Sequence, residues 1–495
     1  MALLFRKKLL SIFRVNHMQG REFAVGAALL LGYVDEIDPR LIKDYSATGA
    51  MHILSVSGMH VGIIFLVLEK LLAFLKRFRY GIALKTTLVI LLIWFYAMLT
   101  GLSPAVLRAA AMISLVAFGN SIRRSPDILN TLAASVLFLL IWNPLYILDV
   151  GFQLSYLAVG GIIVLNKSVY NLFQPSKWLV DQVWAIMAVS LSAQVATFPL
   201  SLYYFHQFPN YFMFTNILVV PLSSLIIYIG ILLLFFGTIP FISLCIAKVL
   251  VFLISLLNGS IHFIEELPLS TIKGIVINEW ELLILYMFFI GMILFFFSKR
   301  KAFLFISLGI IILLTGSGLI KKINRLTCEK LIVYHLQQGS AFEFVDQGKC
   351  ILAGNQVFTI NDFSSDIIQN TRMVLGCKEK LKLLIHPFVK NTSPVISGNF
   401  YKKGNFIQFN GEKIGIINSG LPAGPISAKL NLDLLILSGN PKVKIADLLK
   451  LFTFRKIVID ATNPEWKARN WINEAKLSGI GYYSVSASGA FVMDL

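Results

Sequence analysis

Residues 48–62, T-G-A-M-H-I-L-S-V-S-G-M-H-V-G, open the first long apolar run of the chain. The stretch nevertheless contains two histidines, two serines and three glycines. Ionisable side chains at membrane depth cost a few kcal/mol each and normally face the interior of a helix bundle or a water-filled path. A segment that only had to sit in lipid would avoid this mixture. The stretch therefore predicts a membrane bundle with a polar interior.

The rest of the chain fits a membrane protein followed by a soluble domain. Apolar runs dominate residues 52–319, and a composition typical of soluble proteins returns from residue 321. Only 14% of the 495 residues are charged, against roughly a quarter in soluble domains. The fold class predicted is a polytopic α-helical membrane protein of about nine to eleven spans, some of them short or broken, followed by a soluble α/β domain. Ten candidate spans are predicted, at 52–74, 86–99, 105–119, 128–141, 153–165, 183–202, 212–236, 241–257, 281–297 and 303–319.

The chain is predicted to divide into three parts. Residues 3–15 are amphipathic and basic, which is typical of a helix lying in the headgroup plane. The predicted parts are an N-terminal amphipathic helix at 1–20, a transmembrane domain at 21–320 and a soluble domain at 321–495. The run at 23–33 is too short to cross a membrane alone.

Loop charge predicts the orientation of the spans. The loops at 75–85, 120–127, 166–182 and 298–302 all carry Lys or Arg, whereas those at 100–104 and 203–211 carry none. By the positive-inside rule the first set is cytoplasmic, which places the C-terminal domain outside the cytoplasm. The basic N-terminus conflicts with this arrangement. Either its helix lies on the membrane surface or an upstream portion is missing from this chain.

The tail is predicted to be a basic α/β or mostly β domain. From Lys321 onward it contains 22 Lys and Arg against 13 Asp and Glu. This excess fits a polyanionic partner such as nucleic acid, and fits solubility or attraction to anionic lipid equally well. The four cysteines show no spacing typical of a zinc site or a disulfide framework. Strands are predicted at 331–334, 341–345, 350–353, 381–385, 413–417, 432–437 and 455–460, and helices at 443–452 and 463–475, the second capped by Asn463.

The opening stretch supplies the first candidate site residues. These side chains are predicted to line a hydrophilic passage or to contact phosphates and bases. Alternatively, His52 sits at the membrane interface and His60 bonds a backbone carbonyl in the bundle. S-V-S-G also resembles, weakly, the serine motif of an intramembrane hydrolase with a histidine base. The candidates are His52, Ser55, Ser57, Gly58, His60 and Gly62.

Further polar residues interrupt the later spans. Each of them could instead be a hydrogen bond between helices, worth about 0.6 kcal/mol. Several such sites in one bundle favour a shared polar path over separate hydrogen bonds. These candidates are Arg108, Asp149, Gln153, Ser155, Gln194 and Asn216.

Several motifs resemble one family. H-I-L-S-V-S-G-M-H-V-G at 52–62 resembles the signature H-L-L-A-I-S-G-L-H-V-G of the ComEC competence family, the inner-membrane DNA-uptake channel. Further motifs match in the same order, and the resemblance covers roughly residues 20–300. It implies a channel that passes single-stranded DNA across the cytoplasmic membrane in natural transformation. The supporting motifs are L-L-L-G (29–32), L-T-G-L-S-P-A-V-L-R-A (99–109), N-P-L-Y-I-L-D-V-G-F-Q-L-S-Y-L-A-V (143–159), A-Q-V-A-T-F-P-L-S-L-Y-Y-F (193–205) and N-I-L-V-V-P-L (216–222).

The chain also departs from the family pattern. Family members commonly carry transmembrane helices and a small OB-type β-barrel ahead of this point, and here the chain begins almost at the competence domain. The tail resembles the family's metallo-β-lactamase-like domain in outline, with His335 and Ser340 where acidic residues stand. The H-x-H-x-D-H motif is absent, and the tail holds only two histidines, His335 and His386. The domain is therefore expected to be degenerate, with no catalytic residues, no metal and no cofactor.

The expected location is the cell inner membrane, with several passes. The resemblance implies single-stranded DNA, membrane lipid and other competence proteins as partners. Those proteins would be a DNA receptor, a helicase or ATPase (since no Walker A loop occurs) and a separate nuclease. Homo-oligomerisation stays open. The alternatives are a transporter of another solute or lipid-linked substrate, and an intramembrane serine hydrolase.

Overall fold

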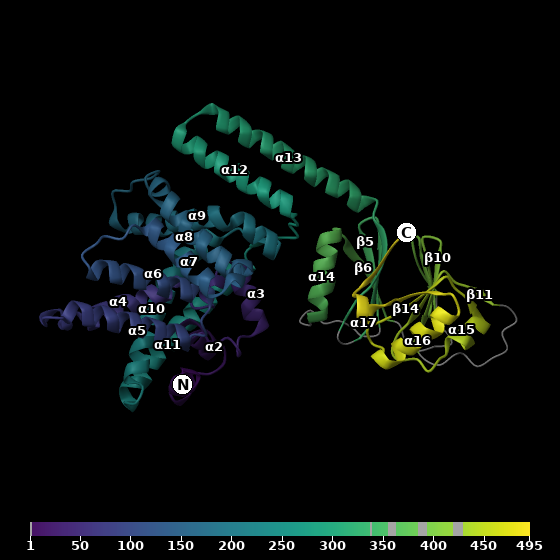
Figure 1. The fold of residues 1–495 in the computed structure, drawn as a ribbon, viewed down its shortest axis with the longest axis horizontal. Helices are drawn as coiled ribbons and strands as arrows, with labels where there is room; N and C mark the ends of the chain where they lie inside the picture. The colour runs from purple at the N-terminus through teal and green to yellow at the C-terminus, as the bar shows by residue number, and fades with distance from the viewer. Residues whose placement is uncertain (1, 337–338, 355–362, 385–393, 419–428) are drawn as a thin grey trace. The chain divides into compact units, whose positions relative to one another are not determined.

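The chain folds into two compact units, Met1–Ser307 and Leu308–Leu495. The structure is a computed structural model that describes residues 2–336, 339–354, 363–384, 394–418 and 429–495 (Figure 1). Unit 1 is helical apart from one short strand pair, β1 (Gln207–Pro209) with β2 (Thr271–Lys273). Its α-helices are α1 (Ala2–Val15), α2 (Gly20–Leu31), α3 (Pro39–Ala47), α4 (Gly58–Leu71), α5 (Gly81–Leu99), α6 (Pro104–Ser121), α7 (Ile128–Trp142), α8 (Val150–Tyr170), α9 (Trp178–Phe205), α10 (Phe212–Phe236), α11 (Pro240–Glu266), α12 (Glu279–Ser298) and the start of α13 (Lys301–Leu326), with 3-10 helices η1 (Met51–Ile53), η2 (Ala73–Arg77) and η3 (Pro144–Leu148).

The multi-pass fold class is confirmed. Among the described residues, eight helices are long and apolar enough to cross a membrane: α5, α6 and α8–α13. Two of the ten predicted spans correspond to helices that are too short to be among these eight. α4 has 14 residues and α7 has 15, so at 1.5 Å per residue each is about 21–23 Å long, less than the ~30 Å of a hydrocarbon core.

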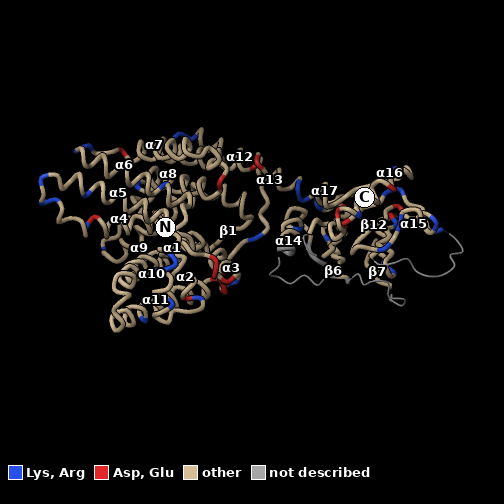
Figure 2. The backbone as a smooth tube through the Cα atoms, turned by 60° about the horizontal axis from the view of Figure 1, so that its bottom comes forward, with Lys and Arg blue, Asp and Glu red and all other residues tan. Residues whose placement is uncertain are grey.

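Helix caps explain where several of these helices begin. The Asp38 side chain accepts a hydrogen bond from Arg40 N–H at the start of α3, and Pro39 lies in the first turn of that helix. Asp127 caps α7 in the same way. Successive helices from α5 to α11 pack on one another through short connections, so they alternate in direction. Figure 2 shows the Lys and Arg of this unit mainly at helix ends and turns.

α2 forms the centre of the largest apolar core. Nine of its residues are buried, and it packs against α10 and α11. Gly230 of α10 allows this close approach, because a Cβ there would lie 2.2 Å from Leu30 Cδ1. The short run predicted at 23–33 is therefore a buried core helix. α1 packs on α2 and α5 with Phe13 buried; its position on a membrane surface stays a prediction.

Unit 2 contains two β-sheets that pack face to face. One core combines residues of both sheets, such as Phe342 and Phe344 of one with Phe409 and Ile414 of the other. The five-stranded sheet has the order β16-β3-β4-β5-β6, and the seven-stranded sheet β15-β14-β12-β10-β9-β8-β7. The strands are β3 (Glu329–Val333), β4 (Ala341–Asp346), β5 (Lys349–Gly354), β6 (Lys378–Leu384), β7 (Val395–Ser397), β8 (Phe400–Lys403), β9 (Phe406–Phe409), β10 (Glu412–Ile417), β12 (Leu434–Leu437), β14 (Lys456–Ile459), β15 (Gly481–Ser484) and β16 (Phe491–Asp494), with a separate pair β11 (Leu430–Asn431) and β13 (Phe452–Thr453).

Helices cover the outer faces of both sheets. α15 (Ile445–Leu451) and α16 (Glu465–Leu477) share an apolar core with the seven-stranded sheet. α14 (Phe363–Leu375) does so with the five-stranded sheet, and α17 (Val485–Ser488) is a single turn. The mixed α/β fold predicted for the tail is thereby confirmed. Residue 385 of one predicted strand, and His386, lie outside the described residues.

One predicted cap in this unit is wrong. The residue at the N-cap of α16 is Pro464, not Asn463. The Asn463 side chain is buried and donates hydrogen bonds to Leu437 O at 2.8 Å and to Asp460 Oδ1 at 2.9 Å. Asn463 therefore links the ends of β12 and β14 and does not cap α16.

Asp460 itself is a buried carboxyl at the end of β14. Burial raises its pKa from 3.8 to about 6, although hydrogen bonds from Ser438 and Thr462 act in the opposite direction. The folded state therefore holds the proton more tightly than the unfolded chain does.

We expect the free energy of unfolding of unit 2 to fall as pH rises from about 4 to about 6. In this window the native state binds more protons than the unfolded chain, so the stability present at low pH is lost, by about 3 kcal/mol in total for this group. Asp460→Asn should remove this slope. Hydrogen exchange of β12 and β14 amides in the full chain, corrected for intrinsic rates, measures the effect. An equal slope in both proteins would contradict it.

Candidate functional site

The stretch singled out in the sequence forms an irregular segment that leads into a short helix. Residues 48–57 contain only the single turn of η1 before α4 begins. At 14 residues, α4 spans about 21 Å. The C-terminal end of α4 leads through η2 to the basic turn before α5. The first turn of α4 therefore lies within the depth of the bundle. Irregular backbone at that depth is tolerated only inside protein or beside a water-filled cavity.

Ser57 and His60 fix the start of α4. The two form a capping box, in which Ser57 N–H donates to His60 Nδ1 at 3.1 Å. The acceptor role of Nδ1 places the proton of a neutral imidazole on Nε2. That atom is buried and has no hydrogen-bond partner among the described residues. The alternative that His60 bonds a backbone carbonyl is thus not what the structure shows.

Arg108 of α6 lies directly against the first residue of α4. A Cβ on Gly58 would be 2.5 Å from Arg108 Nη2, so a side chain at this position would require the guanidinium to shift. Arg108 Nε donates to Ser155 Oγ of α8 at 2.7 Å, and the guanidinium carbon lies 5.9 Å from the centre of the Tyr156 ring. We refer to these four residues, Gly58, Arg108, Ser155 and Tyr156, as the Arg108 site.

The charge of Arg108 is not compensated. The residue is only 7% exposed, and within the described residues no carboxylate lies within 4 Å of its nitrogens. Its other hydrogen-bond acceptor is the weak Sδ of Met112 at 3.7 Å. A buried charge without a counter-ion is costly in a membrane bundle. The Arg108 site is therefore suited to an anion.

Tyr156 was not among the residues predicted from the sequence. Its hydroxyl pairs with Ser135 Oγ of α7 at 3.0 Å, which extends the polar contacts across α4, α6, α7 and α8. The only sequence signal for it is its position beside Ser155 in the Q-L-S-Y motif. Ser135 has no such signal.

The remaining candidates on α8 have local partners. Asp149 is exposed and accepts from Phe152 N–H at 2.8 Å as the cap of α8. Gln153 donates to Ile147 O at 2.7 Å and accepts from Tyr204 O–H of α9 at 3.1 Å. These contacts explain both residues structurally. Gln153 lies about half a turn before Ser155 on α8, and Asp149, the N-cap residue, lies about one and a half turns before it.

A second polar contact joins α9 and α10. Asn216 Nδ2 donates to Ser190 Oγ at 3.1 Å, while its Oδ1 is buried without a hydrogen-bond partner in the described part of the chain. Gln194 is half-buried four residues after Ser190 and therefore on the same face of α9. Among the described residues, no hydrogen bond joins this group to the Arg108 site.

Three residues of the opening stretch are exposed or border open space. Ser55 and His52 are exposed, and His52 Nδ1 is 3.1 Å from Gly49 O. A Cβ on Gly62 would meet no neighbouring atom within 4 Å, so the space beside it is open. The stretch thus has an exposed part, at His52 and Ser55, which is followed by the buried start of α4.

Most of the candidates occupy one level of the bundle. Gly58, Arg108, Ser155 and Asn216 each lie within about two turns of a helix start, and the segments that lead into these four starts (48–57, 100–103, 143–149 and 206–211) contain no Lys or Arg. Gln194 lies about three turns from the end of α9 at the same side. The predicted path residues are therefore concentrated toward one side of the membrane unit.

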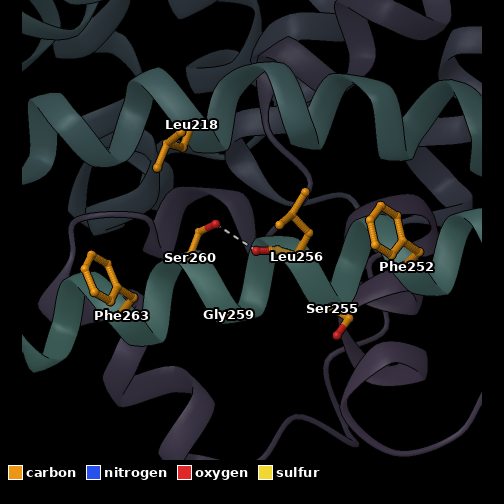
Figure 3. A pocket seen from close by; sticks show the side chains of 7 residues that line it. All are labelled: Leu218, Phe252, Ser255, Leu256, Gly259, Ser260 and Phe263. Atoms are coloured by element: carbon orange, nitrogen blue, oxygen red, sulfur yellow. Dashed lines mark hydrogen bonds between the residues drawn. The ribbon is translucent and has the colours of Figure 1, made fainter.

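The surface groove between α10 and α11 is a different feature. Its volume is about 500 Å³, and its lining includes Leu218, Phe252 and Phe263 (Figure 3). Both phenylalanines are largely exposed, and the Ser260 hydroxyl is satisfied by Leu256 O in its own helix. None of the predicted path residues lines it, and its character fits lipid.

Comparison with known proteins identifies the family. The family described as "Competence protein" matches residues 29–301, and the family described as "ComEC C-terminal domain" matches residues 331–495. The chain belongs to the ComEC competence protein family. The first match contains the Arg108 site and both halves of the α9–α10 contact.

Three curated relatives of this ComEC-family chain share part of its sequence. It is 34% identical over 205 residues (41% of the chain) to ComE operon protein 3 of Bacillus subtilis, of which the match covers 25%. It is 27% identical over 210 residues (40% of the chain) to recombination protein 2 of Haemophilus influenzae, of which 26% is covered. An uncharacterised protein of Aquifex aeolicus is 32% identical over 145 residues, 29% of the chain and 33% of that protein. The chain spans a third or less of each relative, and no solved structure matches it. The likeness of the tail to metallo-β-lactamases stays a prediction.

Proposed function

We propose that the protein passes single-stranded DNA across the cell inner membrane during natural transformation. The observation that carries this proposal is the uncompensated Arg108 between Gly58 and Ser155 inside the membrane unit. Membership of the competence protein family, and the name of one relative, recombination protein 2, agree with a DNA substrate.

A phosphodiester fits the Arg108 site chemically. Guanidinium presents a planar fork of donors that matches phosphate oxygens, and it holds its charge at any physiological pH. Tyr156 adds an aromatic face beside it, and base–aromatic stacking tolerates every base. Neutral neighbours such as Ser155 and Ser135 accept a polar strand without repelling it. A DNA strand that passes through the membrane unit has to leave each contact again. One strong phosphate contact among weak polar contacts allows this movement.

The C-terminal unit is proposed to act as a basic guide outside the cytoplasm. Its excess of Lys and Arg favours a polyanion, and the loop charges support its location. We propose that it is not an enzyme, because its sequence lacks the H-x-H-x-D-H motif. Strand degradation and energy would then come from a separate nuclease and a helicase or ATPase.

The serine hydrolase alternative receives no support from the geometry. A general base must reach the hydroxyl proton that it abstracts. His60 Nδ1 instead accepts from the backbone N–H of Ser57. Transport of another solute or lipid-linked substrate remains the competing function, and the test below separates it from DNA passage.

Deletion of the gene in a naturally competent host is expected to reduce transformants by several orders of magnitude, with recovery on complementation by the full chain. DNA delivered by electroporation bypasses the membrane step and controls for recombination. Normal transformation in the deletion strain would overturn the proposal. A variant truncated after residue 326 tests the guide separately, since unchanged uptake would refute that role alone.

A further inference from the structure

A second group of polar side chains lies away from the Arg108 site, where α3 meets α11. Asp44 comes from α3, and His262 and Glu265 from the last turns of α11. One ligand atom from each lies within 4.8 Å of the others. Figure 2 shows acidic residues gathered around α3.

Asp44 is a buried carboxylate with no strong counter-ion. It is 8% exposed, and in the described part of the chain neither Lys nor Arg lies within 4 Å of its oxygens. Its ion-pair neighbour is His262, whose Nδ1 is 3.4 Å from Asp44 Oδ2 and is buried without a hydrogen bond. Lys43 pairs with Glu265 only at 3.9 Å. The negative charge of this group is therefore poorly balanced.

The distances fit two ligands that share one cation. Ligand atoms about 2.1 Å from a tetrahedral metal ion lie about 3.4 Å from each other, which is the separation between Asp44 Oδ2 and His262 Nδ1. A direct hydrogen bond to a carboxylate would normally be shorter, near 2.7–2.9 Å.

Glu266 supplies the support that a metal-bound histidine needs. Its Oε1 lies 3.3 Å from His262 Nε2, on the side of the ring opposite Asp44. A carboxylate beside Nε2 favours the tautomer that carries its proton there and leaves Nδ1 free to bind a metal, as in a carboxylate–histidine–metal triad.

From this geometry we propose that Asp44, His262 and Glu265 bind a divalent metal ion that joins α3 to α11. One imidazole and two carboxylates suit Zn²⁺ or Mn²⁺, with water in the remaining position. Nearby contacts also link the two helices, including Tyr45 O–H to Asn258 Oδ1 at 2.8 Å. Because α3 ends at Ala47, directly before the stretch at 48–62, the ion is a structural clamp on the segment that leads into α4. This site does not depend on DNA passage.

The test uses the full chain, purified in detergent and stripped of metal with a chelator. Zn²⁺ and Mn²⁺ are then added separately, and bound metal is measured by mass spectrometry and, for Mn²⁺, by electron paramagnetic resonance. We expect one saturable ion per chain and a rise in Tm. Asp44→Asn and His262→Gln should each abolish binding. Glu266→Gln should weaken it about 10-fold or more, as loss of an outer-shell partner typically does.

The matched control is Glu36→Gln, an exposed carboxylate that pairs with Arg14; it should bind the ion as the wild type does. Should Asp44→Asn fail to fold, the wild-type stoichiometry and His262→Gln still decide the matter. Absence of a saturable ion from the wild type, or equal binding in wild type and His262→Gln, would refute the site. The first result would indicate that His262 only contacts the neighbouring carboxylates and holds no ion.

Discussion

Arg108→Gln is expected to lower transformation frequency by about a hundredfold or more while the protein accumulates in the membrane at the wild-type level. The substitution keeps a polar, though shorter, side chain and removes the charge. A hundredfold loss corresponds to about 2.7 kcal/mol, the strength of one or two charge-assisted hydrogen bonds to phosphate. The measurement is transformant number per microgram of DNA in a deletion strain that carries the variant, with membrane levels determined by immunoblot.

Arg108→Lys tests whether uptake depends only on the positive charge or also on the planar guanidinium group, and Arg124→Gln is the control. Arg108→Lys keeps the charge but has no planar fork, and it has to fit beside Gly58, so we expect an intermediate loss of about tenfold. Arg124→Gln removes an exposed arginine from the turn between α6 and α7 and should leave uptake unchanged. Wild-type transformation by a stably inserted Arg108→Gln protein would contradict the phosphate role.

A purely structural role for Arg108 predicts a different result. If its purpose were the hydrogen bond to Ser155, then Ser155→Ala should reproduce the defect and both variants should melt at lower temperature. If Arg108 binds phosphate, Ser155→Ala retains most of the uptake, because the guanidinium stays in place against Gly58. Tm measurements on both purified variants separate the two roles.

The sequence indicated which residues were unusual but not which of them meet. Apolar runs with embedded Arg108, Ser155 and Gly58 predicted a polar interior, because each residue violates the local composition of its own helix. Helical periodicity shows the face of one helix and carries no information on the neighbouring helix. The contact of Arg108 with Gly58 depends on where α4 starts, and that start is set by a capping box with His60 in the place usually held by Glu or Gln.

The same limit explains the other differences. Strands in the tail were predictable because short β-branched and aromatic runs are buried on both faces. The role of Asn463 was not, since its amide is taken by Leu437 O and Asp460 after β12 and β14 come together. Asp44 and His262 are far apart in the sequence, so no spacing motif reports their proximity. Local sequence patterns determine which helices and strands form, whereas tertiary contacts determine which side chains pair with one another.

Arg372→Ala is expected to lower the free energy of unfolding of unit 2 by about 3–5 kcal/mol. Glu343 on β4 has a side chain that is 0% exposed. It is held by an ion pair with Arg372 of α14 and by a hydrogen bond from Tyr334 O–H. Removing the arginine leaves a charged carboxylate in the core between α14 and the five-stranded sheet, and breaking one partner of a buried pair costs this much. Such a loss is a large share of the stability of a domain of this size.

Hydrogen exchange of β4 and β5 in the full chain provides the measurement, because these central strands open only when the sheet does. The expected loss corresponds to an increase in exchange rate of about two to nearly four orders of magnitude. Arg469→Ala is the matched control. Arg469 and its partner Glu465 are one turn apart on α16 and more than three-quarters exposed, so the exchange of β4 should not change.

The double variant Glu343→Leu with Arg372→Leu separates the cost of an unpaired charge from the value of the pair. If the damage in Arg372→Ala comes from a stranded carboxylate, replacing both charges by apolar side chains should restore much of the stability. If instead the ion pair itself supplies the stability, the double variant will exchange as fast as the single one. Near-wild-type exchange in Arg372→Ala would show that Tyr334 alone satisfies Glu343, and it would remove the basis for both expectations.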